Sequence, residues 1–223
     1  MIPDISLKEN KEQRTPCVLV LDGSLSMQTD GAIDALNEGL QKFEVALKED
    51  DGAITRVRIM VICMGGDEGV SILQHWVDAI DFTAPTVVAD GLTPMGKAME
   101  LAISEIENEK TRLKAAGISY TRPWVFLMSD GGPNDDNWKK VAERSCTAQS
   151  NKQFVLFPVG TGDSVNKEAL ELFALDKPMV RVDTTKFGEM FEWLSNSLST
   201  VSQATPGEGQ VSLAEPQWGT VEA

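Results

Sequence analysis

The chain has 223 residues, of which 42% are hydrophobic and 24% charged, and it carries a formal net charge of −14. Apart from the charge, this composition is typical of a water-soluble globular protein, and the length suits one sizeable α/β domain with short extensions better than two full domains. The negative charge disfavours binding to nucleic-acid phosphates and to anionic membranes, and we therefore expect neither as a partner. The same acidity favours cations or basic partners, or serves solubility alone.

The start of the chain and its cysteines indicate a compartment. The first segment, MIPDISLKENKEQR, lacks the apolar core of a secretory signal, and no run approaches the roughly 20 apolar residues of a membrane helix. Cys17, Cys63 and Cys146 are odd in number and far apart, so we predict reduced core residues rather than disulfides or zinc ligands. We expect a cytoplasmic protein.

The pattern of apolar residues predicts strands that alternate with helices. Residues 1–14 are expected to form a loosely held arm, and residues 203–223 an extended tail in which Trp218 docks on the body or on a partner. Between them, we predict a single domain, 15–202. Its elements are strands at 17–21, 56–64, 70–77, 124–128, 154–159 and 179–182, and helices at 33–47, 94–116, 138–148, 167–175 and 187–201.

This order predicts a doubly wound, mostly parallel central sheet with helices on both faces. The short strand at 70–77 follows its predecessor closely enough to form an antiparallel hairpin at the sheet edge. His75 lies in that strand without a partner at ligand-like spacing, so we predict a surface or packing role for it. In the long helix, the charged residues Glu105, Glu109 and Lys114 are expected on a solvated face, and residues 160–162 are expected to form a turn.

Two predicted strands end in carboxylates. Asp22 follows the first strand and is succeeded by Ser24 and Ser26, and Asp130 follows the strand at 124–128. Because the carboxyl ends of parallel strands lie at one edge of a sheet, we expect the two carboxylates to meet there. Their joint burial is costly unless a cation neutralises them, and an oxygen-only ligand set suits Mg²⁺. The alternative is that Asp22 and the serines only cap the next helix, as Thr93 would cap the helix at 94–116.

Three segments together resemble the von Willebrand factor A family. They are LDGSLS (21–26), GLTPMGKAMELA (91–102) and FLMSDGGPNDD (126–136), in the order and at about the spacing of that family's metal-ion-dependent adhesion site. The flanking IDALNEGL (33–40) and the DFTAP segment (81–85) are most similar to small cytoplasmic bacterial A-domain proteins of the TerY type, associated with tellurium and stress resistance. The resemblance covers residues 15–202 and implies a Rossmann-like fold.

The resemblance also implies a site and a function. Ser24, Ser26 and Thr93 would offer hydroxyls to the metal, and Asp22 and Asp130 would bind it directly or through water. The metal would be Mg²⁺, with Mn²⁺ or Ca²⁺ as alternatives. Neutral inner ligands leave much of its charge unquenched, so an open position attracts a Glu or Asp of a protein partner. The family resemblance thus implies a non-enzymatic binding module, with genomically adjacent stress-response or phosphosignalling proteins as partners.

Two residues depart from the family pattern. Leu25 stands where the family usually has Gly between the two serines, and Leu92 stands where it usually has Gly before the threonine. Loss of glycine restricts backbone angles in loops that must curl around an ion, and Gly23 is a candidate for compensation in the first loop.

Two rival interpretations remain open from the sequence. Asp22 after an apolar strand and the segment SDGGPNDD are also similar to haloacid-dehalogenase-like phosphatases, but that family places a second Asp where this chain has Ser24, and a serine is a poor general acid near neutral pH. A metal-free scaffold, in which the acidic loops are only caps, is the other alternative.

Overall fold

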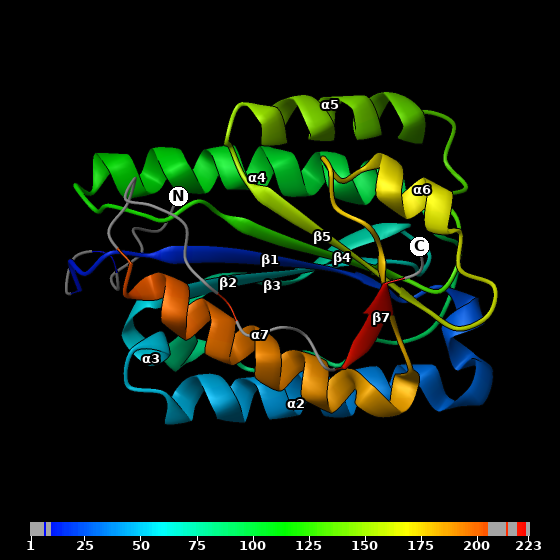
Figure 1. Cartoon of the computed structure of the whole chain (residues 1–223), viewed down its shortest axis with the longest axis horizontal. Helices are drawn as coiled ribbons and strands as arrows, with labels where there is room; N and C mark the ends of the chain where they lie inside the picture. The colour runs from blue at the N-terminus through cyan, green and yellow to red at the C-terminus, as the bar shows by residue number, and fades with distance from the viewer. Residues whose placement is uncertain (1–6, 8–9, 205–212, 214–217, 222–223) are drawn as a thin grey trace.

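A seven-stranded sheet forms the centre of the molecule, with strand order β3-β2-β1-β4-β5-β6-β7 (Figure 1). The computed structural model describes residues 7, 10–204, 213 and 218–221. The parallel strands are β1 (Thr15–Asp22), β2 (Val57–Met64), β4 (Trp124–Ser129), β5 (Val155–Thr161) and β6 (Val180–Val182), and the antiparallel edge strands are β3 (Val70–Asp78) and β7 (Gly219–Val221).

Helices cover both faces of this sheet, as Figure 1 shows. One face carries α4 (Met95–Ala115), α5 (Trp138–Ser150) and α6 (Lys167–Leu172), and the other carries α2 (Ala32–Glu49), α3 (Ala53–Arg56) and α7 (Phe187–Ser202). Short 3-10 helices lie at Leu25–Gly31 (η1), Ala79–Asp81 (η2) and Thr184–Lys186 (η3).

The two helical layers enclose two apolar cores. Along β1, Leu19 and Leu21 point into the core under α2 and α7, and Val18 and Val20 point into the core under α4 and α5. This alternation follows from the pleat of a strand, and burial on both faces explains why β1 reads as an unbroken apolar run. The predicted fold class, including the antiparallel edge strand β3, is confirmed.

Buried charges at the amino end of the sheet contradict one prediction. Glu109 was expected on a solvated face of α4, but its side chain is 1% exposed and pairs with the fully buried Arg58. Arg58 also contacts Asp78 at 3.0 Å, and Asp78 binds the buried Arg14 at the same distance. The prediction was wrong because Arg58 of β2, together with Arg112 of α4, which lies 3.2 Å from Glu109 Oε2, neutralises this carboxylate inside the fold.

Both extensions of the domain contact its body. Leu7, within the predicted arm, is 4% exposed and packs with Leu113 and Ile118. Trp218 is 4% exposed, and its ring lies 5.4 Å from that of Trp193 on α7. The next residues form β7, a strand that the sequence did not predict. The remaining predicted arm and tail residues, 1–6, 8–9, 205–212, 214–217 and 222–223, lie outside the described part of the chain.

Several boundaries differ from the predictions. Gly160 and Thr161 continue β5 instead of forming a turn, and Arg56 ends the short helix α3 instead of starting β2. The three cysteines are unpaired, but Cys146 is only half-buried, unlike Cys17 and Cys63. His75 is exposed on β3, as predicted. Among the described residues, none of the helices combines the length and apolarity needed to cross a membrane.

Candidate metal centre

A chain of hydrogen-bonded oxygens lies at the carboxyl edge of the sheet, where β1 and β4 end. The backbone N–H of Ser24 donates to Asp22 Oδ1 at 2.8 Å, and the hydroxyls of Ser24 and Ser26 lie 3.0 Å apart. The Ser26 hydroxyl donates in turn to Asp130 Oδ1 at 2.8 Å. The structure therefore brings together four of the five residues predicted for the site, from two loops that are 104 residues apart at Ser26 and Asp130.

The four residues form a gradient from the protein interior to solvent. Asp22 is fully buried and Ser24 is 3% exposed, whereas Ser26 is exposed and Asp130 is half-buried. Burial raises the pKa of Asp22, and the nearby charge of Asp130 adds to this rise, while hydrogen bonds from Ser129 and Ser24 oppose it. The surrounding protein therefore compensates the charge of an ionised Asp22 only in part, and a bound cation would supply the missing positive charge.

Ser129 is a site residue that the sequence analysis did not single out. Its hydroxyl donates to Asp22 Oδ2 and accepts the backbone N–H of Gly131 at 3.1 Å. The side chain thus fixes the orientation of the Asp22 carboxylate and links it to the loop after β4. Its place at the last position of β4, beside the end of β1, was the only signal in the sequence.

Thr93, the fifth predicted residue, joins the group through its backbone. Its carbonyl oxygen accepts the N–H groups of Met95 at 2.8 Å and of Asn134 at 3.1 Å, which connects its loop to the one that carries Asp130. Thr93 is 8% exposed. Within the described residues, no hydrogen bond joins its hydroxyl to the other four side chains, so the structure places Thr93 at the site without a direct side-chain link.

The long connection before Thr93 is fastened to the first loop and to α2. Asn37 makes two hydrogen bonds with the backbone of Val87, accepting its N–H at 2.8 Å and donating to its carbonyl at 2.9 Å. Gln28 donates to the carbonyl of Ala89 at 2.9 Å. These contacts hold an irregular segment in one position, so they fix where Thr93 lies.

Asp135 caps the start of α4. Its carboxylate accepts the backbone N–H groups of Gly96 at 3.1 Å and of Lys97 at 2.9 Å, which have no partner inside the helix. Asp136, the next residue, is exposed. The loop after β4 therefore offers Asp130, rather than Asp135, as its carboxylate at the oxygen chain.

Glycines close to Leu25 and Leu92, the two residues that differ from the family pattern, provide the backbone conformations that the loops need. A Cβ atom at Gly23 would lie 2.6 Å from Cys63 Sγ, so only glycine allows the first loop to approach β2 this closely. Gly91, one residue before Leu92, has a φ of 73°. Leu25 and Leu92 themselves do not have positive φ values, and both side chains are exposed, at 56% and 71%. Gly23 thus supports the first loop, as suggested from the sequence.

The donor set of this edge suits a hard cation. It consists of two carboxylates and neutral hydroxyls, and among the described residues no three His, Cys, Asp or Glu side chains gather where they could hold a metal. Burial, with a smaller effect from the charge of Asp22, raises the pKa of Cys63 to about 11. This thiol stays protonated near neutral pH, so it does not add a soft thiolate ligand.

The sequence from 17 to 193 matches the model of the von Willebrand factor type A domain. The chain belongs to this family. No curated protein matches the sequence. A metal-binding adhesion motif is typical of the family.

Solved A-domain structures share the fold at low sequence identity. The von Willebrand factor type A protein from Catenulispora acidiphila is 16% identical, with a TM-score of 0.64 over 84% of this chain and 43% of its own. The mussel byssus protein PTMP1, in a structure with a zinc-occupied MIDAS motif, is 14% identical, with a TM-score of 0.57 over 85% of this chain and 49% of its own.

A third neighbour matches over nearly its full length. The vWF domain of the type V pili tip protein Mfa5 from Porphyromonas gingivalis is 11% identical, with a TM-score of 0.61 over 89% of this chain and 99% of its own. The chain spans less than half of the first two proteins. At these identities the likeness shows the fold alone.

Proposed function

We propose that this domain binds a protein partner through a divalent cation, without chemistry of its own. The cation is Mg²⁺, held by the carboxylates of Asp22 and Asp130 and by the hydroxyls of Ser24, Ser26 and Thr93. The partner supplies a Glu or Asp side chain. Zinc in the adhesion motif of PTMP1 supports a divalent ion at such a site, and the hard oxygen donors of this chain favour Mg²⁺ over zinc.

The observation that carries the proposal is the oxygen chain itself. Asp22 is fully buried and lies near a second carboxylate, and within the described part of the chain its hydrogen bonds come from neutral donors alone. In an isolated fold, such an arrangement costs stability, whereas a cation between Asp22 and Asp130 turns the same charges into ligands. The exposure of Ser26 and the half-burial of Asp130 leave the outer side of the site accessible to a partner.

The chemistry of the ligands explains why the partner is acidic. Two carboxylates balance a divalent charge formally, but hydroxyl ligands carry no charge and quench it less than further carboxylates would. When the cation is bound, it supplies an electrophilic position on the outer side. A partner carboxylate is the protein group that best satisfies this position.

The test is metal binding by isothermal calorimetry, followed by capture of partners in Mg²⁺ and in EDTA. We expect wild-type protein to bind one Mg²⁺ and Asp130→Ala to bind none. Asp136→Ala is the matched control, since this exposed aspartate lies in the same loop. A partner retained by wild type and Asp136→Ala only in Mg²⁺ supports the proposal. Equal capture by all variants with and without Mg²⁺ would favour a metal-free scaffold.

A finer assignment rests on the resemblance of the segments flanking the site. IDALNEGL (33–40) and GLTPMGKAMELA (91–102) are similar to TerY-type bacterial proteins, which supports a cytoplasmic role in a tellurium-resistance, stress-response or phosphosignalling system. The captured partner tests this assignment, because proteins of such a system are expected among those retained in Mg²⁺. Retention of an unrelated class of protein would contradict it while leaving the metal site intact.

A further inference from the structure

A cavity of about 720 Å³ adjoins the oxygen chain on the α7 side of the sheet. Its lining includes Ser26 and Asp130 of the oxygen chain, Thr161 at the end of β5, and Lys186 and Trp218. The pairing of Ser129 with Gly160 places Thr161 in register with Asp130, one position further along the two strands. The cavity is thus continuous with the proposed metal site.

Two buried donors in this wall lack partners. Thr161 is fully buried and Trp218 is 4% exposed, and neither the Thr161 hydroxyl nor the indole N–H of Trp218 makes a hydrogen bond within the described part of the chain. Both residues line this one cavity. A buried polar group without a partner is costly, so two in one place indicate a ligand that supplies acceptors.

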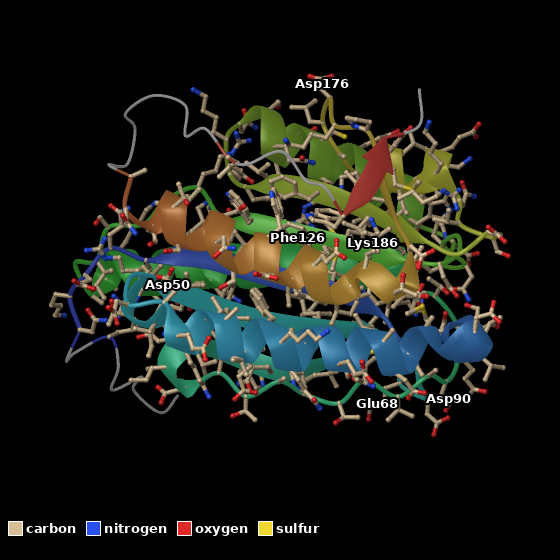
Figure 2. All side chains as sticks on the ribbon, turned by 60° about the horizontal axis from the view of Figure 1, so that its bottom comes forward. Asp50, Glu68, Asp90, Phe126, Asp176 and Lys186 are labelled. Atoms are coloured by element: carbon tan, nitrogen blue, oxygen red, sulfur yellow. The ribbon has the colours of Figure 1, made fainter. Side chains whose placement is uncertain are left out.

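Cationic side chains add to these donors. Lys186, labelled in Figure 2 near the first turn of α7, makes no ion pair among the described residues, and Arg181 lines the cavity while donating to the carbonyl of Gly162. Three carboxylates, of Asp30, Asp163 and Asp183, also line the cavity, but all three are exposed. Water screens the charges of these exposed carboxylates, whereas the buried hydroxyl of Thr161 and the buried indole N–H of Trp218 are shielded from water.

We propose that this cavity binds a second carboxylate of the acidic partner, beside the carboxylate that reaches the metal. The inference rests on the proposed metal site and adds a ligand class to it: a segment with two acidic side chains on one side of an extended chain. Lys186 supplies the opposite charge, and a shift of the cavity wall on binding brings the buried hydroxyl of Thr161 and the buried indole N–H of Trp218 to the second carboxylate. The exposed carboxylates of Asp30, Asp163 and Asp183 limit the preference to a single additional carboxylate, because they would repel a longer run of acidic side chains.

The test compares two matched peptides at saturating Mg²⁺. Ac-Gly-Glu-Gly-Glu-Gly-NH₂ carries two carboxylates on one side of an extended strand, and Ac-Gly-Glu-Gly-Gln-Gly-NH₂ replaces one by an amide of the same shape. We expect the first to bind about tenfold more tightly, the effect of roughly one charge-assisted hydrogen bond. Nuclear magnetic resonance titration of labelled protein measures both affinities and shows whether the signals of Thr161 shift.

Two variants examine the donors. Thr161→Val keeps the shape of the side chain and removes its hydroxyl, and Trp218→Phe keeps an aromatic ring and removes the indole N–H. Each should weaken binding of the two-carboxylate peptide and leave binding of the other peptide unchanged. Thr161→Val should also raise the melting temperature, because it removes an unpartnered buried hydroxyl. A residue with a purely structural role would not lose binding and gain stability together. Thr200→Val, on the exposed side of α7, is the control.

The outcomes separate the subsite from the metal site. Binding of both peptides with equal affinity in Mg²⁺, or a preference that survives in Thr161→Val and Trp218→Phe, would overturn the subsite and leave the metal site in place. Absence of Mg²⁺-dependent binding for either peptide would overturn the proposed function and the subsite together. A preference that both variants abolish supports the subsite.

Discussion

Replacing Asp22 with asparagine should stabilise the metal-free protein and abolish its response to Mg²⁺. Asn keeps one acceptor oxygen for the N–H of Ser24, 2.8 Å from Oδ1 in the wild type. It also presents an amide toward the hydroxyl of Ser129, which can accept as well as donate. The substitution thus removes a fully buried charge while keeping the shape and both contacts.

The size of the effect follows from two opposing terms. Weakening two charge-assisted hydrogen bonds to neutral ones costs about 1–3 kcal/mol, whereas removing an uncompensated buried charge gains several kcal/mol. A net gain of about 2 kcal/mol corresponds to a rise of roughly 4–8 °C in melting temperature for a domain of this size. Mg²⁺ at a hundredfold excess over its Kd would stabilise the wild type by about 2.7 kcal/mol, and it should not stabilise the variant.

The assay is thermal unfolding of wild type and variant in EDTA and in a series of Mg²⁺ concentrations. Asp176→Asn is the matched control, since Asp176 is an exposed residue after α6 (Figure 2), and its φ of 53° is one that asparagine tolerates. A variant that melts below the wild type in EDTA would refute the view of Asp22 as an uncompensated buried charge. A variant that keeps the Mg²⁺-dependent rise would refute its role as a ligand.

Three further substitutions address the frame around the site. Asp78→Asn leaves two buried arginines short of a partner and should lower the free energy of unfolding in urea by about 3–5 kcal/mol. Asn37→Ala removes two hydrogen bonds to the loop before Thr93 and should cost about 1–2 kcal/mol and weaken Mg²⁺ binding, whereas the exposed Glu38→Ala should do neither. The backbone N–H of Ala84 holds the pKa of Glu44 below 4.5, so the ionised Glu44 carboxylate stabilises the fold above that pH, and this contribution is lost on acidification. Glu44→Gln should therefore reduce the fall in melting temperature between about pH 5 and pH 3.

The order of elements could be predicted from the sequence because its signals are local. Unbroken apolar runs at 17–21 and 124–128 indicate strands buried on both faces, and the helical stripe at 33–47 indicates a covering helix. Alternation of the two types then requires a mostly parallel sheet, which places Asp22 and Asp130 at one edge. The gathering of the two carboxylates follows from topology alone, and the structure shows it.

Features that depend on contacts between distant parts of the chain could not be predicted from local sequence signals. Glu109 lies at a position of α4 that helical spacing predicts to be solvated, and its burial is made favourable by Arg58, which approaches from β2, together with Arg112 of α4 itself. The docking of Trp218 on the body or on a partner was predicted, but its contact with Trp193 in α7 could not be. The unpartnered hydroxyl of Thr161 has no signal in the sequence, because a threonine at the end of a strand is ordinary until its surroundings are known.

The two leucines at the site show how a departure from a family pattern can leave loop geometry intact. Glycine is required where φ is positive or where another backbone approaches closely, and these conditions hold at Gly91 and Gly23 rather than at Leu92 and Leu25. The first loop is also joined to the second by a hydrogen bond from the N–H of Leu25 to the carbonyl of Gly91 at 3.1 Å. Both leucine side chains therefore point outward without strain, so their identity affects the surface that a partner meets and not the formation of the site.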